Sequence, residues 1–92
     1  MESLRPIIDD FESSANDMLI KINVAVETNK LEEVRAAAHQ LKGTSGMLGM
    51  NQLYKLSENI ESLRLEDITP TYLDSLKGTL QQTIDAARKA LA

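Results

Sequence analysis

Apolar residues recur at alternating spacings of three and four in four segments of the chain. This is the period of a helix that buries one face. The four stripes are Ile8, Phe11, Ala15, Met18, Ile22 and Ala25; Leu31, Val34, Ala38, Leu41, Ser45 and Leu48; Leu53, Leu56, Ile60 and Leu63; and Leu73, Leu76, Leu80, Ile84, Ala87 and Leu91. The pattern predicts four helices, at residues 4–28, 30–48, 51–65 and 70–91.

The breaks between these segments carry residues that end or begin helices. Asn29 and Gly49 can each take the left-handed conformation that closes a helix. Asn51 and Thr69 are suited to cap the third and fourth helices, and Pro70 is suited to a first helical position. Connections of a few residues force neighbouring helices to run antiparallel. We therefore expect an all-α fold, an antiparallel up-down-up-down four-helix bundle.

Length and composition narrow the class of protein further. A chain of 92 residues holds one compact core, so residues 1–92 are expected to form a single domain. The absence of cysteine excludes disulfides, thiolate metal sites and cysteine nucleophiles. A net charge of -4 argues against nucleic-acid binding. Without a long apolar run or a signal peptide, we expect a cytoplasmic protein that makes no membrane contact.

The only histidine stands in the middle of the second predicted helix. At about 100° per residue, the apolar stripe of this helix is centred about 140° from His39, so the ring is expected to face water. Lys42, Gly43 and Gly46 follow at spacings that place them on the same outward face, and Arg35 completes a basic edge. Taken singly, an exposed histidine or lysine on a helix usually has no special role.

The two glycines indicate that this face has a function. Glycine inside a helix costs about 1 kcal/mol relative to alanine, and a bundle gains nothing from two glycines on its solvent face. The period places them away from neighbouring helices, so we expect that an external partner needs the room. Lys42 can offset the charge of an anion on the ring of His39, and a phosphoryl group is the obvious anion. A neutral imidazole has a free nitrogen that can act as the nucleophile.

The segment His39-Gln40-Leu41-Lys42-Gly43, with Gly49 ten residues after the histidine, resembles the signature of histidine-containing phosphotransfer (HPt) domains. These domains belong to bacterial two-component systems and multistep phosphorelays. The resemblance implies that His39 accepts a phosphoryl group from an aspartate of one receiver (response-regulator) domain and passes it to an aspartate of another. It implies that Lys42 helps to hold the phosphoryl group and that Gly43 leaves room for it.

Some residues near His39 differ from the family pattern, and others are assigned a role on geometry alone. The family often has a Gly-Asp pair where this chain has Asn29-Lys30, and lysine is a poor N-cap. Gly46 is assigned the same clearance role as Gly43 on geometry alone. Met47 and Met50 lie on the flank of the histidine face, where they either fill the core or dock a partner helix. Ser45 is expected to be buried and bonded to a backbone carbonyl.

The sequence supplies a nucleophile and a cation but no ATP-binding signature, phosphate-binding loop or obvious carboxylate cluster. We therefore expect no ATP-dependent kinase activity and no cofactor of its own, with Mg²⁺ held by the partner receiver. The chain is either free-standing or part of a hybrid sensor kinase. A non-catalytic adaptor bundle that binds partner helices remains the alternative, and it predicts that His39→Gln leaves function intact. A metal or cofactor bundle needs several converging ligands, which one outward histidine does not provide.

Overall fold

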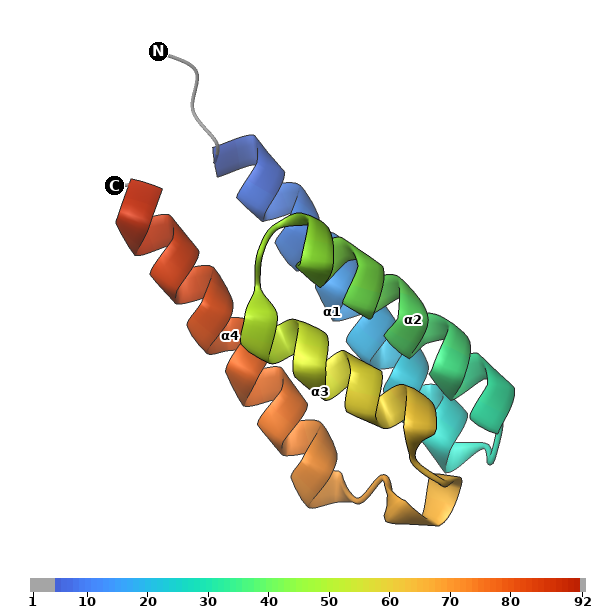
Figure 1. Cartoon of the computed structure of the whole chain (residues 1–92). Coiled ribbons are helices and arrows are strands. Elements are labelled where there is room, and N and C mark those ends of the chain that lie inside the picture. Colours follow the sequence, from blue (N-terminus) through green and yellow to red (C-terminus); the bar gives the residue numbers. More distant parts are fainter. Residues whose placement is uncertain (1–4, 92) are drawn as a thin grey trace.

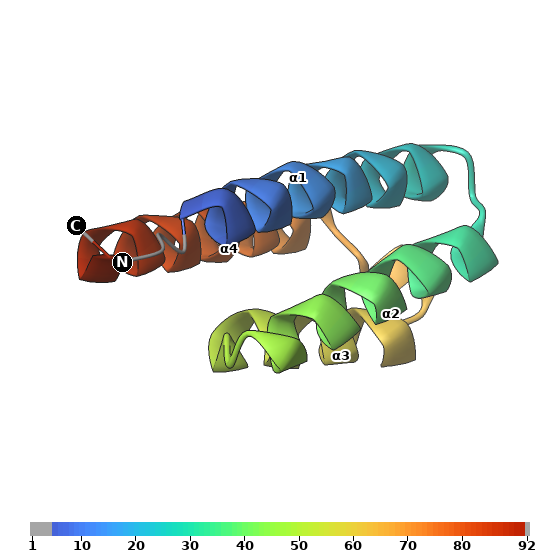
Figure 2. The same ribbon diagram turned by 90° about the horizontal axis from the view of Figure 1, so that it is seen from above.

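The computed structural model describes residues 5–91, which form four α-helices and one short 3-10 helix. The elements are α1 (Arg5–Glu27), α2 (Leu31–Met47), α3 (Asn51–Ser62), η1 (Leu65–Asp67) and α4 (Pro70–Leu91). The chain reverses its direction at each connection between α-helices (Figure 1). Figure 2 shows α1 and α4 in one layer and α2 and α3 in the other. No strand occurs within this range, so the predicted all-α four-helix bundle is confirmed.

The first two connections close in the same way, with the backbone in the left-handed region. Asn29 has a φ of 59° and Gly49 a φ of 71°. After α1, the N–H of Lys30 donates to the carbonyl of Ala25; after α2, the N–H of Met50 donates to the carbonyl of Ser45. These bonds satisfy carbonyls that a helix end otherwise leaves unpaired. The predicted roles of Asn29 and Gly49 are confirmed, and each turn fixes where the next helix begins.

The limits of α3 and the start of α4 agree only in part with the predictions from sequence. Thr69 Oγ1 accepts a hydrogen bond of 3.2 Å from the N–H of Tyr72, and Pro70 is the first helical residue, as predicted. The prediction that Asn51 caps α3 is wrong, because Met50 occupies the cap position and makes no side-chain cap bond. The predicted end of this helix at residue 65 is also wrong. The backbone becomes extended at Leu63, which brings Ile68 into the core.

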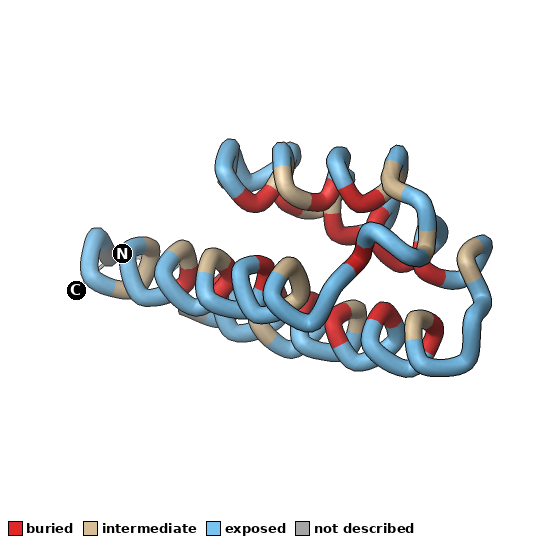
Figure 3. The backbone as a smooth tube through the Cα atoms, turned by 90° about the horizontal axis from the view of Figure 1, so that it is seen from below, coloured by how far each residue is buried: buried red, intermediate tan, exposed pale blue. Residues whose placement is uncertain are grey.

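The core lies between the two layers, where the buried positions of the helices face one another (Figure 3). Most of the predicted stripe positions are buried, and Ser45 donates a hydrogen bond of 2.6 Å to the carbonyl of Leu41, as expected. Leu48 is an exception at 39% exposure, because α2 already ends at Met47. The side chain of Leu91 lies outside the described residues. Small buried residues let α2 pack closely against both α1 and α3.

Candidate functional site

The imidazole of His39 stands on the outer surface of α2. Its side chain is 73% exposed, whereas Ala38 and Leu41, the apolar residues beside it in the sequence, are fully buried. The buried positions hold the opposite face of the helix against the core, so the ring faces water as the helical period predicts. The helix therefore presents this side chain on a rigid support rather than on a loop.

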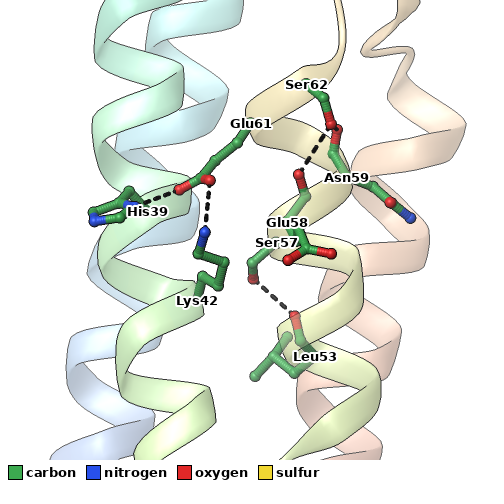
Figure 4. Close-up of polar contacts among 8 residues, drawn as sticks. All are labelled: His39, Lys42, Leu53, Ser57, Glu58, Asn59, Glu61 and Ser62. Carbon is green, nitrogen blue, oxygen red and sulfur yellow. Dashed lines mark hydrogen bonds and ion pairs between the residues drawn. The ribbon is translucent and has the colours of Figure 1, made fainter.

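A carboxylate from α3 joins the ring to the neighbouring lysine (Figure 4). Glu61 Oε1 lies 2.7 Å from His39 Nδ1, and Glu61 Oε2 lies 2.9 Å from Lys42 Nζ. The Lys42 and Glu61 side chains are 21% and 22% exposed, so the ion pair is partly shielded in the groove between α2 and α3. The site thus holds an imidazole, a cation and an anion, whereas sequence reasoning identified only the first two.

The contact with Glu61 assigns the proton on the neutral imidazole. An ionised carboxylate only accepts hydrogen bonds, so at 2.7 Å the Nδ1 atom of His39 must donate. In the neutral ring Nε2 then carries the free lone pair. Figure 4 shows this second nitrogen on the side of the ring away from Glu61. In the neutral ring the lone pair is therefore on Nε2, which points toward solvent.

The two charged partners of the ion pair stabilise each other's ionised form. The hydrogen bond from Lys42 is the main reason that the pKa of the Glu61 carboxyl lies below its ordinary value of 4.5, and the hydrogen bond from His39 adds to it. The same bond with Glu61 raises the pKa of the Lys42 ammonium above 10.5. Desolvation opposes both shifts but is outweighed. Both groups are therefore fully charged at neutral pH.

The lowered pKa of Glu61 predicts how stability depends on pH. A carboxyl whose pKa is lower in the folded state than in the unfolded state stabilises the fold above the unfolded value, and this contribution is lost as pH falls through the folded value. We therefore expect wild type to be more stable than Glu61→Gln above pH 4.5, with the difference shrinking at lower pH. Urea unfolding over this range measures the difference. The matched variant Glu58→Gln, which changes an exposed residue on the same helix, should show a much weaker trend.

Of the other predicted site residues, Arg35, Gly43 and Met47 are exposed, whereas Met50 packs against the core. A Cβ added to Gly43 would meet nothing within 4 Å, so the open space expected beside the ring is present. Arg35 is exposed on the same helix, one turn before the histidine. Met47 is 88% exposed at the last position of α2, but Met50 packs against the core. The core alternative therefore holds for Met50, and a docking role remains open for Met47.

The expectation that both glycines face away from neighbouring helices is wrong for Gly46. A Cβ at this position would lie 3.2 Å from Cδ2 of the Tyr54 ring on α3. This is closer than an ordinary van der Waals contact, so the glycine makes room for a side chain of the same domain. Gly46 lies one turn before the α2–α3 connection, where the next helix packs across it. The clearance role predicted for Gly46 is therefore not supported, and the clearance role of Gly43 stays a prediction.

A signal for Glu61 was present in the sequence. His39 lies eleven residues before Met50 and Glu61 lies eleven residues after it. In an antiparallel pair of helices joined by a tight turn at this point, residues equally far from the turn lie at the same height. Combining this symmetry with the i+3 position of Lys42 identifies an acidic residue opposite both groups.

A family model for the Hpt domain matches residues 6–90. The chain belongs to this family. No curated protein and no solved structure gave a match. Membership of the Hpt family means phosphotransfer in phosphorelays, in which Hpt domains work with receiver domains. Among residues 5–91, no helix is long and apolar enough to span a membrane, and no group of three or more His, Cys, Asp or Glu residues is placed to hold a metal ion.

Proposed function

We propose that His39 is the phosphoryl carrier of this Hpt domain, accepting the group from a receiver aspartate and passing it to another receiver aspartate. The observation that carries the proposal is the orientation of the ring. Glu61 holds the Nδ1 side, so the lone pair of the neutral ring is on Nε2, which is open to a partner. A surface histidine without a function has no need of a carboxylate that fixes its proton.

The transfer balances without a separate base. The lone pair on Nε2 attacks the phosphorus of the aspartyl phosphate, the N–P bond forms, and the bond from phosphorus to the carboxylate oxygen breaks. The aspartate leaves as a carboxylate, and the proton on Nδ1 stays on the ring. The imidazole then carries a positive charge, which the Glu61 carboxylate at 2.7 Å offsets. Passing the group to a second receiver is the same reaction in reverse.

In this proposal, Lys42 and Gly43 accommodate the incoming phosphoryl group. The Lys42 ammonium rests on Glu61 in the free domain and can turn toward the phosphoryl oxygens when they arrive. The space beside Gly43 admits the phosphoryl group and the receiver surface that delivers it. Phosphoryl transfer also requires charge neutralisation at the leaving oxygen. We assign that role to Mg²⁺ held by the receiver.

Lys42→Ala is expected to slow transfer from a phosphorylated receiver by about tenfold or more, because it removes one charged donor to the transferring group. The matched control is Lys55→Ala, which removes an exposed ammonium from the middle of α3. Rapid-quench measurement of label transfer compares the two variants with wild type. Equal rates for all three proteins would remove Lys42 from the site.

The proposed function is tested by incubating the chain with a phosphorylated receiver and analysing the label that it acquires. A phosphoryl group on histidine is labile in acid and stable in base, whereas an acyl phosphate is labile in base. Because the chain has a single histidine, phosphohistidine in a hydrolysate of the labelled protein locates the group at His39. ATP alone should give no label. If no phosphorylated receiver transfers label to the folded wild-type chain, the proposal is overturned.

A further inference from the structure

The ring of Tyr54, in the first turn of α3, lies directly over Gly46 of α2. A Cβ built on Gly46 would be 3.2 Å from Cδ2 and 3.3 Å from Cε2 of this ring. The ring therefore fills the space that a side chain at position 46 would take. Glycine is a poor residue for the interior of a helix, so this close approach requires an unfavourable residue in α2.

The space filled by this ring borders Lys42. Gly46 lies one turn after Lys42 on the same face of α2, and the side chains of a helix lean back toward its N-terminus. A side chain at position 46 would therefore cover Lys42 on the side away from His39. Gly46 has no side chain, and neither has Gly43, so α2 leaves this side of the lysine open. The Tyr54 ring closes it from α3.

Two properties of Lys42 agree with a wall at this position. Its side chain is only 21% exposed, although it stands one turn from the well-exposed ring of His39. The pKa of its ammonium is raised mainly by the hydrogen bond with Glu61, and the ionised forms of Tyr54 and Glu58 raise it further. Such an effect weakens with distance, so the phenol lies near the ammonium. The lysine is therefore enclosed between two side chains of α3, Glu61 and Tyr54.

We propose that Tyr54 is a positioning residue that holds the Lys42 ammonium beside the imidazole of His39. The inference rests on the proposed function and adds a residue that acts through the lysine. A lysine side chain is long and flexible, and a free one samples many conformations. The ring excludes those that turn toward Gly46, which leaves those that reach Glu61 in the free domain or the phosphoryl oxygens during transfer. A phenol is uncharged at neutral pH, so the ring acts through the space it fills.

The first test measures the ion pair between Lys42 and Glu61 without a receiver. In Tyr54→Ala the lysine gains conformations away from Glu61, so the pKa of the Glu61 carboxyl should rise toward its ordinary value of 4.5. An NMR titration that follows the carboxyl carbon of Glu61 measures this change. Tyr54→Phe keeps the ring and should titrate as wild type does. An unchanged titration of Glu61 in Tyr54→Ala would overturn the proposal.

Tyr72→Ala is the matched control for the loss of an aromatic side chain. Tyr72 is the other tyrosine of the chain, it is partly buried as Tyr54 is, and it lies on α4. Thermal unfolding shows whether the two alanine variants are comparably stable. Tyr72→Ala should leave both the titration of Glu61 and the transfer rate at the wild-type values. An equal change in both alanine variants would assign the effect to stability and overturn the proposal.

The second test measures transfer from a phosphorylated receiver. We expect Tyr54→Ala to slow transfer by about 3- to 10-fold, because a less well placed cation stabilises the transferring group less. Tyr54→Phe should retain most of the wild-type rate. The double variant Lys42→Ala/Tyr54→Ala should be no slower than Lys42→Ala, since the tyrosine acts through the lysine. Losses that multiply in the double variant would overturn the proposal.

The two tests separate this inference from the proposed function. If folded wild type takes no label from any phosphorylated receiver, the proposed function is overturned. The titration of Glu61 then still decides whether Tyr54 positions Lys42, because it requires no receiver.

Discussion

His39→Gln is expected to abolish phosphoryl acceptance from every receiver. The amide side chain has no nucleophilic ring nitrogen, and no other histidine is present to replace it. The fold should be retained, because the side chain is 73% exposed and a surface substitution of this kind changes stability by about 0.5 kcal/mol or less. Glutamine can also still donate a hydrogen bond toward Glu61. The expected variant is thus folded and inactive.

Acid-labile label after incubation with a phosphorylated receiver measures the loss, and thermal unfolding checks the fold. The variant should still slow wild-type transfer when added in excess, because the surface around position 39 is otherwise unchanged and the variant competes for the receiver. Label that persists in the variant at the wild-type level would show that another residue carries the group. It would also favour the adaptor alternative, in which the histidine has no chemical role.

Gly43→Leu is expected to slow transfer on the order of 100-fold, since a bulky side chain one turn from His39 displaces the phosphoryl group and its carrier. The same change should stabilise the domain, because leucine is a better helix former than glycine by somewhat under 1 kcal/mol. Gly43 is exposed and a Cβ there meets nothing within 4 Å, so the new side chain starts in open space. Loss of function and gain of stability are therefore expected together.

Gly78→Leu provides the matched control. Gly78 also lies inside a helix, α4, and a Cβ there likewise meets nothing within 4 Å. Both variants should raise the melting temperature by similar amounts, and only Gly43→Leu should slow transfer from the receiver. If Gly43→Leu instead lowered the melting temperature sharply, the conclusion that Gly43 faces open space would be wrong. If both variants transferred at the wild-type rate, Gly43 would have no clearance role.

The features predicted correctly from sequence are those that depend on one helix at a time. The period of three and four places Leu41 inside and His39 outside, and Thr69-Pro70 marks the start of α4 by local chemistry. These predictions require only the geometry of a helix and its cap. They establish the fold class and the outward orientation of His39.

The features that were missed depend on how two helices pack together. Glu61 reaches His39 across the α2–α3 groove, and Gly46 accommodates a ring from α3. Neither contact follows from the helical period of α2, because the position of α3 depends on the connection between the two helices. The groove between α1 and α2, which Ile20 and His39 help to line, was missed for the same reason. The period of α1 alone gives no sign of a surface that this helix shares with α2.

The connection at Gly49 and Met50 has a consequence for how this site can change in evolution. Inserting a single residue there would disrupt the bond from the Met50 N–H to the Ser45 carbonyl, which sets where α3 begins, and would move Glu61 relative to the imidazole. His39 would remain on the surface but without its contact to the Glu61 carboxylate. We therefore expect relatives that keep this arrangement of His39, Lys42 and Glu61 to conserve the length of this turn. The length of the turn thus sets the alignment of Glu61 with His39 and Lys42.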